Sequence, residues 1–505
     1  MDEAQRQQAL RISIADGALA TVGASLAGGI FLVGFALQIL DASALQIGIL
    51  AALPTFANLL QMFGAYLIER TGQRKKLCLT CVTVGRLVWL GIILLPLAMF
   101  DPIGDARVWV LVAIIFIASL ANALAGVAWL SWMSDVVPEK IRGAYFGKRN
   151  MIALTCGTAA LLAGGRFLTE WSDRFGESDP TGYMLLFAFG LAMGLIASLL
   201  LSRMGEPAFQ PSAEKITLSR FALPFRDANF RKLIIFVSGW IFSIQLAGPF
   251  YGVYMIDILG ISFSQITLFI TVATVATLLM MQVWGPISDR VGNKPIILVA
   301  GWGLIAVPFV WLAAVPGSYV LPLFLGHVIS GAFIAGSSLS QFNMLIKLSP
   351  SQGRSIYLAV FAAVTGVIGA MAPMIGGVLV GLLEGFSFNL GPYVVTNLHF
   401  VFLLSSVGQV LVIFLILRVH EEGAAKQTMV LMELRNDLDP QKGVAASSDF
   451  LIFEFRRTSG ILRQLDESSE RLAERSEQRI GRAIENGSKR FGKLGNWLRQ
   501  FLSKD

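Results

Sequence analysis

Three of the ionisable side chains inside the long apolar stretches of this sequence, where charged groups are rare, are candidates for chemistry: Asp16, Arg86 and His327. Arg86 stands nine residues into the stretch 77–100, about 13 Å deep for a helix that rises ~1.5 Å per residue. Asp16 lies one turn into the first apolar stretch, and His327 lies about 10 Å into the tenth. A charge inside a bilayer costs free energy unless it is paired or hydrated, so these groups are candidates for solute binding or ion transfer.

Each of these groups has either a role in solute binding or ion coupling or a purely structural role. Asp16 and His327 are candidates for proton or ion coupling, although a neutral, hydrogen-bonded histidine fits His327 equally well. Arg86 either contributes to a solute cavity or forms a structural pair, for which Asp16 is the candidate partner. Arg166 and Glu170 lie four residues apart near the end of the fifth stretch and are expected to pair at the membrane interface.

The composition excludes a soluble globular protein. Of the 505 residues, 55% are hydrophobic and only 14% are charged, and the mean hydropathy is +0.67. Twelve apolar stretches, each long enough to cross a hydrocarbon core of ~30 Å, are predicted to span a membrane. They are 13–40, 44–68, 77–100, 108–133, 149–171, 182–202, 233–256, 264–287, 296–316, 320–346, 356–383 and 397–418. The first is too long for a cleavable signal peptide, so it is kept as a membrane span.

Basic residues gather in the turns after the even-numbered spans. They are Arg70, Arg74, Lys75, Lys76, Lys140, Arg142, Lys148, Arg203, Lys215, Arg220, Arg226, Arg231, Lys232, Arg290, Lys294 and Arg354. The alternate turns hold only Arg107 and Arg174. By the positive-inside rule, both termini are expected in the cytoplasm and the protein in the inner (plasma) membrane.

The sequence carries an internal repeat. The charged turn from Glu69 to Lys75 returns from Asp289 to Lys294, and the two acids lie 220 positions apart. Three further patterns return in the same order at offsets from 219 to 212. Leu40, Ser43 and Gln46 return as Leu259, Ser262 and Gln265; Pro138, Arg142 and Tyr145 return as Pro350, Arg354 and Tyr357; Gly157, Gly164 and Gly165 return as Gly369, Gly376 and Gly377. The membrane domain is therefore predicted to consist of two similar halves.

The repeated turn suggests a latch. An acid at the end of one helix can face the N-terminus of another, where unpaired N–H groups carry partial positive charge. Glu69 and Asp289 are expected to hold the cytoplasmic side shut and to release it when the halves rock. The gating turns would comprise Glu69, Arg70, Gly72, Arg74, Asp289, Arg290, Gly292, Lys294, Arg142 and Arg354. The alternative is a plain solvated turn, but two copies at matched positions favour the latch.

These features resemble the major facilitator superfamily. The resemblance covers about 13–418 and rests on the twelve spans, the two halves, a basic linker at 203–232 and the acid-Arg-x-Gly-x-basic turns after spans 2 and 8. It implies an all-α membrane protein with twelve transmembrane helices in two pseudo-symmetric six-helix halves. The expected parts are 1–202, the first half; 203–232, the cytoplasmic linker; 233–418, the second half; and 419–505, a cytoplasmic tail.

The resemblance also implies a solute cavity lined mainly by spans 1, 4, 7 and 10. The candidates for that cavity are Ser25, Arg86, Asn122, Gln245, Tyr251, Ser337, Ser338 and Gln341. Uncharged hydrogen-bonding groups with aromatics suit a neutral or weakly charged small organic solute. Each group taken singly could instead bond a neighbouring helix. The basic residue that many proton-coupled members carry in span 4 is not apparent, so proton coupling stays open.

The tail carries a separate pattern. Its apolar positions from Ile480 to Phe501 form a near-heptad stripe, and the stretch from Arg471 onward has a net charge of +5. Such a helix is expected to lie on anionic lipid at the cytoplasmic leaflet. A partner-binding or coiled-coil helix is the alternative.

Together the sequence predicts a secondary active transporter that moves a small organic solute by alternating access, possibly coupled to protons or other ions. The alternative is a non-transporting relative that acts in assembly or sensing through its tail. No nucleotide-binding glycine loop, nucleophile or metal cluster stands out, so we expect no enzyme activity, no catalytic residue, no metal and no cofactor. Cys78 and Cys81 are interpreted as helix-packing residues rather than a redox pair. A monomer without nucleic-acid partners is expected.

Overall fold

The computed structural model describes residues 3–97, 106–207, 221–350, 354–390, 393–425 and 427–437. The chain divides into two compact units, Met1–Gln427 and Thr428–Asp505. All the spans described below belong to the first unit. The amphipathic helix expected within 471–505 lies outside the described residues.

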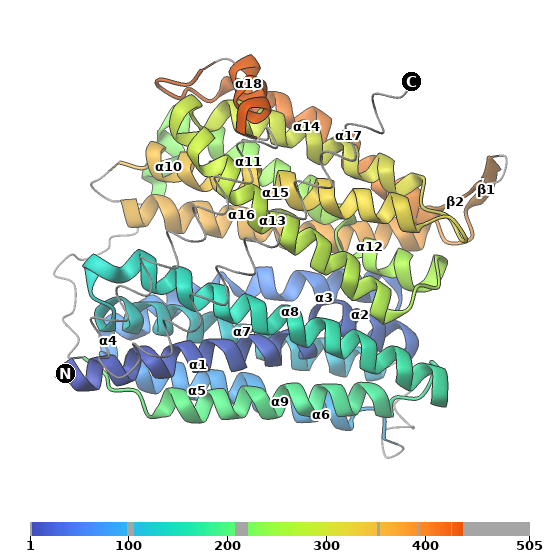
Figure 1. The fold of residues 1–505 in the computed structure, drawn as a ribbon, viewed down its shortest axis with the longest axis horizontal. Helices are drawn as coiled ribbons and strands as arrows, with labels where there is room; N and C mark the ends of the chain where they lie inside the picture. Colours follow the sequence, from blue (N-terminus) through green and yellow to red (C-terminus); the bar gives the residue numbers. More distant parts are fainter. Residues whose placement is uncertain are drawn as a thin grey trace, which may run out of the picture. The chain divides into compact units, whose positions relative to one another are not determined.

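Helices make up nearly all of the described structure (Figure 1). The helices are α1 (Glu3–Ala27), α2 (Gly29–Gln38), α3 (Ala44–Ala57), α4 (Leu60–Thr71), α5 (Arg74–Leu87), α6 (Trp89–Leu94), α7 (Ala106–Val136), α8 (Arg142–Phe175), α9 (Thr181–Ser202), α10 (Leu223–Arg226), α11 (Ala228–Ala247), α12 (Phe250–Val253), α13 (Phe263–Val291), α14 (Asn293–Leu312), α15 (Val320–Leu348), α16 (Arg354–Leu382), α17 (Asn397–Ile413) and α18 (Gln427–Asp437). Short helical turns cover Glu139–Ile141, Tyr254–Ile258 and Phe414–Arg418, and the antiparallel pair β1 (Ser387–Leu390) and β2 (Tyr393–Thr396) precedes α17.

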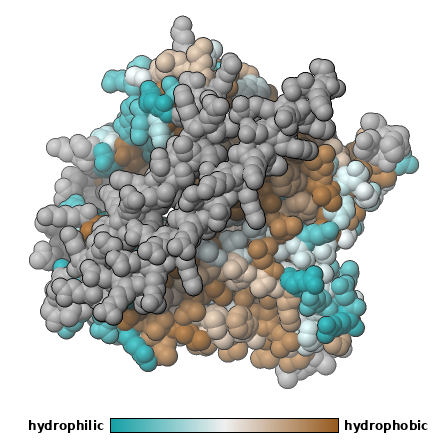
Figure 2. Space-filling model, in the orientation of Figure 1, coloured by the Kyte–Doolittle hydropathy of each residue, from teal (hydrophilic) through white to brown (hydrophobic). Residues whose placement is uncertain are grey.

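These helices form twelve segments long and apolar enough to cross a membrane within the described residues, as the hydropathy predicted. Four of them are interrupted helices, because α1 continues into α2, α3 into α4, α5 into α6 and α11 into α12. The break between α1 and α2 falls at Gly29, whose φ of +54° is readily available only to glycine. Hydrophobic residues cover the lower part of Figure 2, where α5 and α9 lie, and hydrophilic residues gather toward the helix ends.

The repeated Ser-x-x-Gln pattern marks the starts of two corresponding helices, α3 and α13. Ser43 caps α3 by accepting a hydrogen bond from the backbone N–H of Gln46, whose side chain accepts from the N–H of Ser43 in return. Ser262 caps α13 in the same position and accepts from the N–H of Gln265. A serine followed three residues later by glutamine satisfies N–H groups that a helix start leaves open, which explains why this pattern returns.

The two halves meet through two related helix pairs. Within each half the spans pack mainly on one another, and between the halves α3 packs on α16 and α8 packs on α13 (Figure 1). Because the repeat relates α3 to α13 and α8 to α16, the two pairs correspond to one another. The prediction of two pseudo-symmetric six-helix halves is therefore confirmed in the fold.

Candidate functional site

We call the side of the bundle that holds the turns at Gly72 and Gly292 the basic end, and the side that holds the helix starts at Ser43 and Ser262 the far end. Contacts between the halves concentrate toward the far end. Thr169 of α8 accepts a hydrogen bond from the backbone N–H of Ser264, with 2.9 Å between Oγ1 and N. The ring of Phe263 also packs edge-on against Tyr183, with 5.9 Å between centroids.

Two repeated glycines allow this close approach. A Cβ on Gly165 of α8 would meet the carbonyl oxygen of Phe263 at 2.7 Å, and a Cβ on Gly377 of α16 would meet that of Ala44 at 2.5 Å. Both are positions of the glycine pattern that the repeat carries from span 5 to span 11. The sequence repeat at these positions therefore corresponds to contact between the two halves.

A cavity of about 610 Å³ lies between the halves. Spans 1 and 2 provide one wall, including Gly29 and Pro54. The rest comes from spans 7, 8, 9, 10 and 12. Its polar groups are Gln245, Tyr251, His327, Ser330, Ser405 and Gln409, and Trp311 contributes an indole. The volume suits a small organic molecule.

The structure places only some of the predicted cavity residues in this wall. Gln245 and Tyr251 line it, and so does His327, which the sequence suggested for ion coupling. The remaining candidates do not line the cavity: Ser25, Arg86, Asn122, Ser337, Ser338 and Gln341. Ser25 lies beside Gly157, whereas Asn122 is exposed near Gly85 and Ser338 is exposed as well. Ser337 and Gln341 are hydrogen-bonded to one another at 2.7 Å.

Arg86 packs inside the first half. Its guanidinium donates a hydrogen bond to the hydroxyl of Ser198 on α9, and its side chain lies against Gly194, where a Cβ would come within 3.2 Å. This arrangement favours the structural interpretation of Arg86 over a place in the cavity wall.

Replacing Arg86 with alanine should lower the free energy of unfolding by about 1.5–3 kcal/mol, because it removes a charged hydrogen bond and leaves Ser198 unpaired. Arg86→Lys should retain part of that stability. Thermal unfolding of the purified protein, measured beside transport, tests this. If Arg86→Ala had unchanged stability but no transport, Arg86 would have a role in solute binding or translocation rather than a structural one.

Asp16 has a different partner from the one expected. Its carboxylate pairs with Arg149 of α8, 3.8 Å between Nη2 and Oδ2, rather than with Arg86. The guanidinium of Arg149 also donates to the backbone oxygen of Ser13 at 3.1 Å and lies 4.3 Å from the ring centroid of Trp129. Asp16 and Arg149 are both largely buried, at 5% and 14% side-chain exposure. The expected pair of Arg166 and Glu170 is present, 2.7 Å apart and exposed.

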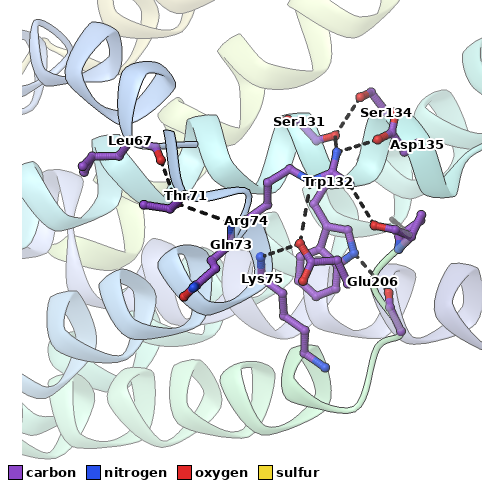
Figure 3. A network of polar contacts seen from close by, with 12 residues as sticks. Leu67, Thr71, Gln73, Arg74, Lys75, Ser131, Trp132, Ser134, Asp135 and Glu206 are labelled. Atoms are coloured by element: carbon purple, nitrogen blue, oxygen red, sulfur yellow. Dashed lines mark hydrogen bonds and ion pairs between the residues drawn. The ribbon is translucent and has the colours of Figure 1, made fainter. Parts of the chain in front are cut away.

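At the basic end, a carboxylate that follows span 6 caps the start of span 3 (Figure 3). Glu206 accepts from the backbone N–H of Lys75 at 3.1 Å, and the Nζ of Lys75 donates to the carbonyl of Met204 at 2.7 Å. Arg74 is buried and bonds Asp135 of α7 at 2.5 Å. We call Arg74, Lys75, Asp135, Met204 and Glu206 the first anchor.

A corresponding cluster joins the end of span 12 to the start of span 9. Glu421 accepts from the backbone N–H of Lys294 at 2.7 Å and of Asn293 at 3.0 Å. The Nζ of Lys294 donates to the carbonyl of Val419 at 2.8 Å, and Lys347 of α15 pairs with Glu421 at 3.2 Å. We call Asn293, Lys294, Lys347, Val419 and Glu421 the second anchor.

Burial raises the pKa of Glu421, but the hydrogen bonds from Lys294, Asn293 and Lys347 lower it further, so the pKa lies below its ordinary value. Neither Glu206 nor Glu421 was predicted as a site residue from the sequence. They lie 215 positions apart, within the range of the repeat offsets, and this spacing is the sequence feature that points to them. Arg149, Ser405 and Gln409 were missed as well.

The predicted gating residues divide into two groups. Arg74, Lys294, Gly72 and Gly292 have defined structural roles, the first two in the anchors and the glycines in left-handed turns with φ of +66° and +86°. Arg142 donates to the carbonyl of Ser134 at 3.1 Å.

Glu69, Arg70, Asp289, Arg290 and Arg354 are exposed. Asp289 makes no hydrogen bond or ion pair with the described residues, and the starts of α5 and α14 are capped by Glu206 and Glu421 instead.

Several solved structures share this fold. The nucleoside transporter NupG, in a mutant form, has a TM-score of 0.63 at 15% identity, covering 81% of this chain and 100% of that chain. The xylose transporter XylE from E. coli, in an inward open conformation, has 0.60 at 16% identity, covering 82% and 96%. An inward-facing, unoccupied bacterial homolog of the human lysosomal transporter Spinster has 0.59 at 16% identity, covering 83% and 96%. At these identities the likeness shows the fold alone.

The amino-acid sequence also matches a known protein family. The model of the Major Facilitator Superfamily matches residues 17–246 and 233–430, which together overlap every predicted span. The chain therefore belongs to the Major Facilitator Superfamily.

Proposed function

We propose that this protein is a secondary transporter that moves a small organic solute by alternating access. The observation that carries the proposal is the cavity of about 610 Å³, which has walls from both halves. A packed interface in that place would instead favour the non-transporting alternative. The basic end is assigned to the cytoplasm and the protein to the plasma membrane, with both termini cytoplasmic.

The arrangement of the two ends supports a state open to the cytoplasm. The halves meet through Gly165 and Gly377 toward the far end, whereas the carboxylate of Asp289 at the basic end is exposed. In the proposed cycle the far end opens as the basic end closes, and Asp289 then engages the other half. The two anchors keep the third and sixth spans of each half together, so each half moves as one body.

Asp16 is the proposed coupling residue. Protonation of its buried carboxylate would leave the guanidinium of Arg149 without its counter-charge, which changes the packing of α1 against α8. His327 is the second proposed coupling residue, since it lies in the cavity wall itself. His327 would link proton transfer to the solute site directly, whereas Asp16 would act through the packing of α1 against α8.

The proposed parts of the chain are the halves 1–202 and 233–418, the linker 203–232 and the tail 419–505. The tail is proposed to bind anionic lipid.

Transport in inside-out vesicles with a panel of neutral and charged solutes, with and without a proton gradient, tests the proposal. Gly252 lines the cavity, and the variant Gly252→Trp should fill it and abolish uptake. Gly381→Trp is the matched control, because a side chain there would meet open space. Equal uptake by Gly252→Trp and the unchanged protein would contradict a pathway through this cavity.

A further inference from the structure

The orientation of the Gln409 side-chain amide is fixed by its hydrogen bonds in the protein. The hydroxyl of Ser405 donates to the backbone oxygen of Ser243 at 2.7 Å. Its single hydrogen is therefore used, so Ser405 must accept from the amide nitrogen of Gln409, 3.1 Å away. We call these two hydrogen bonds, from Gln409 to Ser405 and from Ser405 to Ser243, the relay. Exchanging the oxygen and nitrogen of the Gln409 amide would break it.

The relay leaves the amide oxygen of Gln409 unsatisfied. Gln409 is only 3% exposed, and its Oε1 has no hydrogen-bond partner among the described residues. Ser405 and Gln409 both line the cavity. A buried acceptor without a partner is unfavourable, and a ligand that donates a hydrogen bond to it would remove that cost.

A second acceptor is fixed in the same cavity wall. The Nδ1 of His327 lies 2.7 Å from the carbonyl oxygen of Leu323, and because a carbonyl only accepts, Nδ1 carries the hydrogen. In the neutral ring, Nε2 is therefore an acceptor, and no described residue donates to it. The ring is held between Phe269 and Trp311, each with 5.5 Å between centroids.

The rest of the wall is mainly aliphatic, carries no fixed charge and includes two aromatic side chains, Tyr251 and Trp311. Tyr251 packs against Phe402 and Trp311, with 4.4 and 4.5 Å between centroids. Asp, Glu, Lys and Arg are absent from the described residues that line the cavity. A charged solute would find no counter-charge there, whereas a flat apolar ring can pack against Tyr251 and Trp311.

We propose that the cavity selects neutral, planar ring compounds that carry an N–H or O–H group, that His327 Nε2 accepts a hydrogen bond from them, and that the side chain of Gln409, whose Oε1 is buried in this structure, shifts to accept a second one. This inference rests on the proposed transport function and specifies its solute class. Gln409 and His327 are then the residues that distinguish a donor-bearing ring from the same ring without a donor.

Binding to the purified full-length protein in lipid nanodiscs tests the proposal with matched probes. The pairs are indole and 1-methylindole, phenol and anisole, and uracil and 1,3-dimethyluracil, with indole-3-carboxylate as the charged probe. For at least one pair, the donor-bearing member should bind about tenfold or more tightly than its methylated partner, because only the former satisfies the buried acceptor. Indole-3-carboxylate should bind more weakly than indole.

Two variants make the test specific. Gln409→Leu should reduce the difference within each pair while keeping ring binding, because only the acceptor of His327 remains. Gln61→Leu, at an exposed position of α4 outside the cavity lining, should keep the difference. Equal binding within every pair, no binding of any donor-bearing probe, or an undiminished difference in Gln409→Leu would overturn the proposal.

Uptake of the same probes into proteoliposomes separates this inference from the transport function. Uptake without discrimination by donor would refute the subsite and leave transport standing. Discriminating binding without any uptake would keep the subsite and contradict transport.

Discussion

Replacing Gly377 with valine should reduce transport about fivefold or more while the protein still folds. A Cβ at this position would come within 2.5 Å of the Ala44 carbonyl oxygen and 2.8 Å of the Leu45 Cα, so the halves could not close at the far end. Overpacking of this kind costs about 1–3 kcal/mol, which corresponds to a shift of about 5- to 150-fold between two states. Solute uptake in proteoliposomes, normalised to purified yield, measures the loss.

Two neighbouring glycines in α16 provide the controls. Gly381→Val should leave uptake unchanged, because nothing lies within 4 Å of a Cβ there. Gly376 faces Leu246 within its own half, so Gly376→Val should lower thermal stability instead. Full uptake by Gly377→Val would show that the far end need not close through α3 and α16.

The second large effect is expected at Glu421. Glu421→Ala removes a fully buried carboxylate and leaves the N–H groups of Asn293 and Lys294 unpaired, so the free energy of unfolding should fall by about 3 kcal/mol. Thermal unfolding in detergent measures this change. Glu422→Ala, at the exposed neighbouring position, is the matched control and should change stability little. Similar losses in both variants would refute the capping role.

The same carboxylate predicts a pH dependence. Because its folded-state pKa lies below the ordinary value of 4.5, Glu421 stabilises the fold fully above that value. The stabilisation is lost as the pH falls through the lower folded-state pKa. Thermal unfolding of the unchanged protein and of Glu421→Ala should therefore differ most at neutral pH and converge in acid. A constant difference across that range would contradict the assignment.

The spans and the two halves could be predicted because their signals are local or repeated. Long apolar stretches report membrane helices directly, and the turns at Gly72 and Gly292 need a left-handed glycine in both copies. Ser43 and Ser262 recur because each starts a helix. These features depend on neighbouring residues in the chain.

The cavity wall depends on how helices rotate and pack, which no single stretch specifies. Gln245 and Tyr251 face the cavity, whereas Asn122 at a similar depth lies near Gly85. Ser405 and Gln409 come from span 12, which the four-span expectation left out. Their importance follows from a relay to Ser243, a residue 162 positions away from Ser405.

The partners of buried charges were equally hard to predict. Asp16 has two arginines near it, and depth along a helix does not decide between Arg86 and Arg149. The structure selects Arg149, whose guanidinium lies against Gly17, where a Cβ would come within 2.7 Å. A side chain at position 17 would exclude that pair.

The central claim is that one cavity opens to each side of the membrane in turn. The most direct measurement places a cysteine at Ser330, in the cavity wall, in a protein whose three native cysteines are replaced. A second cysteine pair, Thr169→Cys with Ser264→Cys, locks the far end when oxidised. A membrane-impermeant maleimide should label position 330 from both sides before oxidation, only from the basic end after it, and from both sides again after reduction. Labelling from the far side that persists in the fully locked protein would contradict alternating access through this cavity.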